Sequence, residues 1–214
     1  MSYEDVPAGK IAAVVTSLEM TARPAPRAEQ PNGRLALHQV ERPELAWFRR
    51  LFRRIGENWI WSSRLMMPDA ELAATIHDPL VEVFVLMHGE DEAGLLELDF
   101  RAQGECELSF FGLAPDFVGS GAGRWLMNRA IERAWAQPIR RFWVHTCTFD
   151  HQAAVAFYVR SGFRPWLPPP APSEARWEAT STADPGTLSV SPARLPGELH
   201  RRLPHHREVK NSQH

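Results

Sequence analysis

The chain has 214 residues, of which 44% are hydrophobic, an ordinary content for a soluble globular protein with one substantial core. Its 24 lysines and arginines against 26 aspartates and glutamates leave a formal net charge of −2, so nucleic acid and anionic membranes are poor candidate partners. No apolar run approaches the roughly 20 residues that span a bilayer. No basic segment leads into an apolar one at the N-terminus, so we expect a cytoplasmic protein.

The first part of the chain predicts strands separated by a proline-rich connection and then a helix. Residues 11–19 are predicted as a strand, 23–33 as the connection and 35–40 as a second strand. A helix opens at Pro43-Glu44, with its apolar residues on one face. Residues 57–67 show no clean period but carry many large apolar groups, and we expect them to wall a pocket.

The middle of the chain predicts a short helix followed by three strands. Residues 69–76 form the helix, and 81–87 read as a buried strand. Turn residues then lead into a returning strand at 95–100, which makes an antiparallel hairpin with it. A third strand is expected at 105–113.

After this third strand the pattern alternates between helix and strand. A helix is predicted at 121–137, a strand at 141–146 and a helix at 152–161, which Gly162 is well placed to end in the left-handed conformation. This order favours a parallel crossover behind an otherwise antiparallel sheet. The fold class is therefore α+β, a mixed, mostly antiparallel, twisted sheet flanked by helices.

The composition changes at Pro165, where prolines become interleaved with polar residues and bulky apolar groups become scarce. We expect an N-terminal strand and linker over 1–34, the main domain over 35–165, and a proline-rich, largely disordered tail over 166–214. The sequence leaves open whether the tail completes the sheet and whether the protein assembles as a homodimer.

Neither the cysteines nor the histidines predict a metal site. Cys106 and Cys147 form no CxxC pair and lie in apolar runs, which favours reduced thiols in the core. The histidines are scattered, and the His205-His206 pair has no cysteine or acidic ligands at a recognisable spacing.

The residues with the clearest chemical signal are three glycines at alternate positions, Gly119, Gly121 and Gly123, between a predicted strand and a predicted helix. Glycines let the backbone approach a ligand closely, and the free amides and positive dipole end of a helix entry attract phosphate. A tight helix entry or a plain linker would explain the glycines equally well. A Walker loop is excluded because Arg124-Trp125 follows the last glycine, and the spacing is not that of a Rossmann fingerprint.

Together with a second segment, this loop resembles the GNAT family of N-acetyltransferases. Val118-Gly119-Ser120-Gly121-Ala122-Gly123 matches the small positions of the family's R/Q-x-x-G-x-G/A acyl-CoA signature. Ala154, Tyr158 and Gly162-Phe163 match its N-x-x-A-x-x-x-Y-x-x-x-G-F type segment. The resemblance covers roughly residues 35–165. Val118 stands at the usual Arg or Gln position and His151 at the usual Asn, and the proline run replaces the family's last strand.

The resemblance implies acetyl-CoA as acyl donor, no metal, and a primary amine of a small molecule or peptide as acceptor. The amine would attack the thioester directly, between two splayed central strands. The cofactor-binding residues it implies are Phe111, Leu113, Val118, Gly119, Ser120, Gly121, Ala122, Gly123, Arg124, His151 and Ala154.

Two residues are predicted to carry the proton transfers. Glu107, on the strand leading to the loop, is the first candidate base, with Glu97, Asp99 and His145 in reserve; Glu107 also fits a merely exposed strand face. Tyr158 is the predicted general acid for the departing thiolate, although a core tyrosine would fit the same pattern. A catalytically silent acyl-CoA-binding module and a structural protein whose tail recruits partners remain alternatives.

Overall fold

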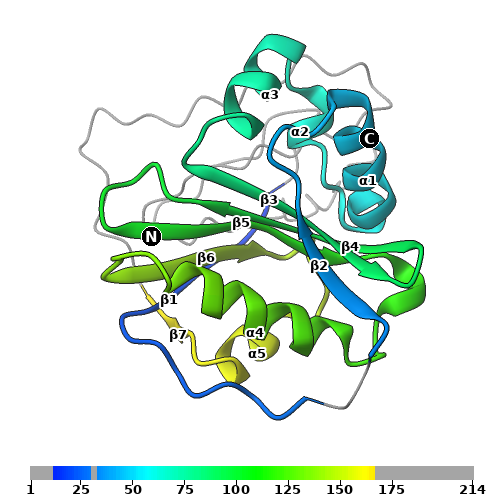
Figure 1. The fold of residues 1–214 in the computed structure, drawn as a ribbon. Helices are drawn as coiled ribbons and strands as arrows, with labels where there is room; N and C mark the ends of the chain where they lie inside the picture. The colour runs from blue at the N-terminus through cyan, green and yellow to red at the C-terminus, as the bar shows by residue number, and fades with distance from the viewer. Residues whose placement is uncertain (1–11, 30–32, 167–214) are drawn as a thin grey trace, which may run out of the picture.

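The computed structural model describes residues 12–29 and 33–166, which form one seven-stranded sheet with helices on both faces (Figure 1). The strands are β1 (Val15–Met20), β2 (Leu35–Gln39), β3 (Val81–His88), β4 (Asp91–Asp99), β5 (Glu105–Leu113), β6 (Arg141–Cys147) and β7 (Arg164–Pro165). The helices are α1 (Leu45–Gly56), α2 (Ser63–Met66), α3 (Asp69–Ile76), α4 (Ala122–Ala134) and α5 (Ala154–Arg160), with short 3-10 turns η1 (Glu57–Trp59) and η2 (Pro115–Phe117).

The sheet is mixed and mostly antiparallel, as the sequence predicts. Its strand order is β2-β3-β4-β5-β6-β1-β7, and β5–β6 is the parallel pair within the described residues. The predicted hairpin is β3–β4, and α4 makes the predicted crossover between the parallel strands. No helix in the described part of the chain is long and apolar enough to cross a membrane.

The N-terminal strand lies inside this sheet and not at its margin. β1 runs antiparallel to β6 along six residue pairs and also pairs with the two-residue β7. It therefore covers the edge of β6 that does not face β5. The strand predicted at 11–19 begins four residues later, at Val15, and the predicted tail from residue 167 onward lies outside the described residues.

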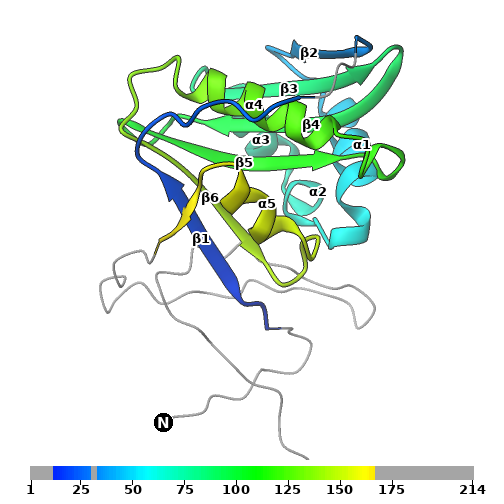
Figure 2. The same cartoon turned by 90° about the horizontal axis from the view of Figure 1, so that it is seen from below.

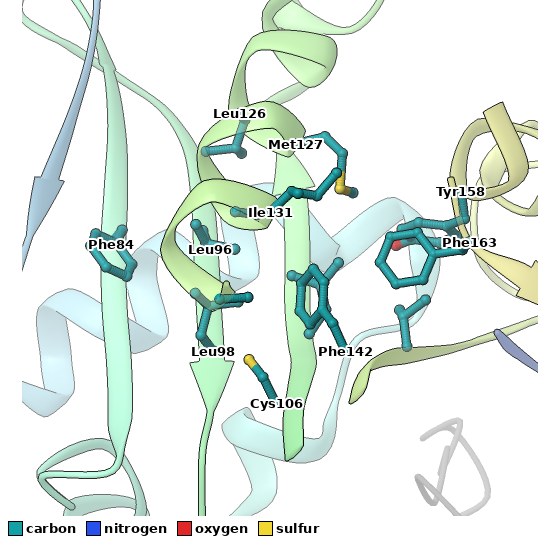
Figure 3. Packing of buried hydrophobic residues seen from close by; sticks show 14 of the residues in the cluster. Phe84, Leu96, Leu98, Cys106, Leu126, Met127, Ile131, Phe142, Tyr158 and Phe163 are labelled. Atoms are coloured by element: carbon teal, nitrogen blue, oxygen red, sulfur yellow. The ribbon is translucent and has the colours of Figure 1, made fainter. Parts of the chain in front are cut away.

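The two faces of the sheet carry separate cores. On one face Leu126, Met127 and Ile131 of α4 pack against Leu96 and Phe142 of the strands (Figure 3). On the other face α1 and α3 cover the opposite side of β3 and β4. Figure 2 shows the same layering from below. Because both of their faces are covered, β3 and β4 are buried along most of their length, whereas burial alternates along β6.

Two irregularities open the sheet near its centre. β5 and β6 pair only from Glu105 to Glu107 and then diverge, so the edge of β5 from Leu108 onward is not bonded to β6. Between β4 and β5 the register shifts so that Glu97 pairs with Phe110 while Leu98 pairs with Leu108. Ser109 is therefore the extra residue of a β-bulge, a feature that bends a strand and redirects its side chains. The predicted splay of two central strands is present.

Candidate active site

A cleft of about 870 Å³ lies where β5 and β6 diverge. One of its walls is formed by the loop before α4 together with α5, and another by the segment between α1 and α3. Most of the residues predicted for the site line this cleft, namely Glu107, Phe111, Leu113, Val118, Gly119, Gly121, Gly123, Arg124, His151, Ala154 and Tyr158. The splay thus gathers residues from four elements into one space.

The glycine-rich loop presents open main chain to the cleft. Gly119 and Gly121 have φ angles of +83° and +90°, in the left-handed region that favours glycine, and a Cβ at either would meet nothing within 4 Å. Within the described residues their amides and that of Gly123 donate to no protein acceptor. These donors stand at the first turn of the 13-residue α4, where the helix dipole favours an anion.

Two residues of the predicted cofactor segment shape this loop without lining the cleft. The Ser120 hydroxyl donates to the Phe117 carbonyl at 2.7 Å and accepts from the Ala122 amide at 3.3 Å. Ala122 itself is buried against the core of α4. Their role is therefore to hold the loop's conformation. Val118, at the position where the family has Arg or Gln, is exposed.

Tyr158 is buried at the inner side of α5 in an aromatic cluster (Figure 3). Its ring lies 5.8 Å from Phe157, 5.7 Å from Phe163 and 6.4 Å from Phe111, centroid to centroid. Burial, and to a lesser extent the charge of Asp150, raise the pKa of the Tyr158 hydroxyl well above its usual range. The hydroxyl therefore keeps its proton at neutral and moderately alkaline pH and can act as a donor.

His151 and Ala154 lie at the start of α5, on the same side of the cleft. The His151 Nδ1 atom accepts from the Ala153 amide at 3.0 Å, so this imidazole satisfies a free donor at the helix entry, as an asparagine can. Its ring lies 5.1 Å from that of Trp59 across the cleft. The substitution of the usual Asn by His151 is thus compatible with the local structure.

Glu107 faces the cleft and is not part of a solvated strand face. Its side chain is 14% exposed, and its Oε1 lies 3.3 Å from the Nδ1 atom of His145 on β6. Both residues line the cleft; Glu107 is the last residue of β5 that pairs with β6, and His145 lies two residues beyond the last paired residue of β6, Trp143. A carboxylate next to an imidazole is a suitable arrangement for removing a proton from a ligand.

The reserve carboxylates Glu97 and Asp99 are held by arginines. Glu97 is buried beneath the cleft, where desolvation raises its pKa despite the Arg64 guanidinium 2.5 Å away. Burial also opposes ionisation of Asp99, but hydrogen bonds from Arg101 of 2.6 to 3.1 Å outweigh it and lower the pKa of Asp99. Glu97 does not line the cleft, whereas Asp99 does. Glu107 lines the cleft and has no arginine within 4.0 Å among the described residues; Asp150 has none either, but it accepts hydrogen bonds from Trp61 and Thr146.

The predicted wall at residues 57–67 lies against β5. A Cβ on Gly112 would lie 2.4 Å from Ile55 and 2.9 Å from Trp61, so the glycine at this position lets Trp61 pack directly over the strand. The Trp61 indole donates to Asp150 at 3.2 Å, which also accepts from Thr146 at 2.7 Å. Asp150 was not anticipated, because it lies in a turn and its partners are 89 residues away or on another element.

The cysteines of the site differ in part from what the sequence predicts. Cys147 was predicted to be a core thiol, but it is only half-buried and lines the cleft, because burial alternates along β6 and Cys147 falls on the less buried face. Burial raises its pKa and that of Cys106. Within residues 12–29 and 33–166, no three potential metal-ligating side chains of His, Cys, Asp or Glu lie together.

A mixed sheet that opens between two parallel strands, with a glycine-rich helix entry at the opening, is the fold of acyl-CoA N-acyltransferases. Residues 44–163 match the model of the Acetyltransferase (GNAT) family. The chain therefore belongs to the GNAT acetyltransferase family. A comparison with curated proteins gave no match.

Solved structures share this fold at low sequence identity. A putative GNAT-family acetyltransferase from Novosphingobium aromaticivorans is 17% identical, with a TM-score of 0.51 over 77% of this chain and 66% of that one. An aminoglycoside acetyltransferase from an uncultured soil metagenomic sample is 14% identical, with a TM-score of 0.51 over 72% and 99% of the two chains. At such identities the likeness concerns the fold alone.

Proposed function

We propose that this protein transfers an acetyl group from acetyl-CoA to a primary amine by direct attack on the thioester. The observation that carries the proposal is one cleft with two chemically different ends. Free amides at the start of α4 suit an anionic donor, and the Glu107–His145 pair suits an amine acceptor. Membership of the GNAT family supports acyl transfer as the reaction.

Donor binding would use main-chain groups. The free amides of Gly119, Gly121 and Gly123 would donate to the diphosphate, in the manner of anion sites at helix entries. The unpaired edge of β5, at Phe111 and Leu113, would bond the amide-bearing arm of the donor like an added strand. Because these contacts do not depend on side chains, Val118 and His151 are compatible with binding.

The chemistry requires one proton to be removed and another to be supplied. Glu107, supported by His145, would take a proton from the ammonium, directly or through water, so that the nitrogen lone pair can attack the thioester carbon. The C–N bond forms, the C–S bond breaks, and the electrons pass to sulfur. Tyr158 would hydrogen-bond to the departing thiolate and supply its proton.

The acceptor would enter beside the aromatic wall. Trp59, Trp61 and Met67 line that side of the cleft, and Phe110 lies beneath Trp61 at 5.3 Å between ring centroids. Together with the carboxylate of Glu107, this surface favours an amine with an apolar portion, on a small molecule or peptide.

A thiol-release assay with acetyl-CoA and a panel of primary amines tests the proposal. We expect turnover on at least one amine and a large loss of turnover in Tyr158→Phe. In parallel, acetyl-CoA at about 100 times its dissociation constant should add roughly 2.7 kcal/mol of stability in a thermal shift. Stabilisation without turnover on any amine, and without an effect of Tyr158→Phe, would instead establish a catalytically silent acyl-CoA-binding module.

A further inference from the structure

Three arginines from separate parts of the chain line the cleft beside the glycine loop. Arg124 is in the first turn of α4, Arg160 is the last residue of α5, and Arg27 lies in the described segment that follows β1. Desolvation, and then the nearby positive charges of Arg124 and Arg160, lower the pKa of Arg27. The cluster therefore concentrates positive charge at one end of the cleft.

This positive charge is not neutralised within the described chain. Several arginines elsewhere in the described chain, such as Arg64, Arg101 and Arg133, lie within 4.0 Å of a carboxylate. By contrast, Arg27, Arg124 and Arg160 have no carboxylate within 4.0 Å among the described residues. Mutually repelling charges without an internal partner indicate an external anion.

Arg27 is also held in place, which a merely solvated side chain would not require. The side chain of Asn128 on α4 is buried; its amide donates to the Arg27 carbonyl at 2.8 Å and accepts from the Arg27 amide at 3.2 Å. Arg124 donates to the neighbouring Ala28 carbonyl at 2.9 Å, and the Arg27 guanidinium lies 3.4 Å from the Ser161 hydroxyl. A fixed backbone lowers the entropy that Arg27 would lose on binding a ligand.

We infer that Arg27, Arg124 and Arg160 bind the 3′-phosphate of the coenzyme A donor and so select it over donors that lack this group. The inference rests on the proposed function, in which the loop amides hold the diphosphate. A ribose phosphomonoester is the donor's other strong anion, and guanidinium groups bind phosphate through charge-assisted hydrogen bonds. Arg27 lies outside residues 44–163, so the family match does not include it.

Calorimetric titration with coenzyme A and with 3′-dephospho-coenzyme A tests the inference without any acceptor amine. We expect the natural chain to bind coenzyme A more tightly, and Arg27→Ala to weaken that binding about tenfold while leaving the dephospho form nearly unchanged. Arg160→Ala should act in the same direction. Arg23→Ala is the matched control, because Arg23 belongs to the same segment but is exposed and does not line the cleft.

The possible results separate this inference from the function on which it rests. The inference is wrong if the natural chain binds both ligands equally, or if Arg27→Ala weakens the binding of both to the same extent. In either case the arginine cluster does not recognise the 3′-phosphate, although the proposed donor site stands. If neither ligand binds, the proposed function fails and the inference fails with it. Thermal denaturation of each variant confirms that a lost affinity does not arise from unfolding.

Discussion

The two ends of the cleft present different kinds of chemical group, main-chain amides at one end and side chains at the other. The donor end, around Gly119 to Gly123, offers main-chain amides whose positions follow from φ angles and from the start of α4. The acceptor end offers side chains held by other side chains, such as Asp99 by Arg101 and Glu107 by His145. Side-chain changes that spare the backbone should therefore affect the acceptor end much more than the glycine-rich loop.

The largest expected effect tests the role of Tyr158, the side chain of α5 that we place at the reaction centre. Tyr158→Phe keeps the aromatic packing with Phe157 and Phe163 but removes the hydroxyl. We expect kcat to fall roughly 100-fold, the lower end for loss of a general acid, with the affinity for acetyl-CoA unchanged. Steady-state kinetics and direct donor titration measure the two effects, and a kcat within twofold of the natural value would remove Tyr158 from the mechanism.

At the acceptor end, Glu107→Gln keeps the shape of the side chain but removes its charge. We expect kcat/KM for the amine to fall roughly thirtyfold, less than for many catalytic bases because His145 remains 3.3 Å away. Donor binding should not change. The loss should shrink at high pH, where the amine is already deprotonated, so a pH profile distinguishes a base from a structural carboxylate.

In the glycine-rich loop itself, changes that alter the backbone should have the largest effect on donor binding. Gly121→Ala places a side chain at a φ of +90°, which costs about 1–2 kcal/mol, so acetyl-CoA affinity should fall about tenfold through a distorted loop. Gly123→Ala is the control, because Gly123 is helical and an added Cβ would make only an ordinary contact, 3.6 Å from Leu113. Equal effects of the two alanines on donor affinity would mean that loop geometry does not govern binding.

A substitution at Val118 tests the donor end through a gain, and not a loss, of affinity for acetyl-CoA. Val118 is exposed at the edge of the cleft, where the family carries Arg or Gln. Val118→Arg should tighten acetyl-CoA binding a few-fold, about the value of a solvent-exposed charged contact, and raise the salt dependence of the affinity. Val118→Leu, which adds volume without charge, should leave both quantities unchanged.

The smallest effect concerns stability at the acceptor end. The pKa of Asp99 is lowered in the folded protein, so its contribution is present above its unfolded pKa of about 3.9 and is lost as the pH falls through the lower folded value. Asp99→Asn should cost about 1 kcal/mol at pH 7, a modest amount because Arg101 is partly exposed. Denaturant titrations should show this difference vanishing towards pH 2.

Much of the fold was accessible from local patterns. The strands at β3 and β5 and the helices α3 and α4 lie within a few residues of their predicted bounds, because apolar periodicity and turn residues act over short stretches. The left-handed conformation predicted for Gly162 is confirmed, and Gly119 and Gly121 adopt it as well. Glu107 was located by its position on the strand before the loop and Tyr158 by its place in the second family segment, and both line the cleft.

What the sequence by itself determined is the order of elements, the glycine-rich helix entry and the candidate proton carriers, since these depend on neighbouring residues. Only the tertiary structure decided that β1 pairs with β6, that His145 lies beside Glu107, and that Arg27 lies near Ser161, 134 residues away. Such contacts depend on which sheet edges and helix faces are left uncovered after the whole chain has folded. That is a property of long-range packing, which no local window of residues contains.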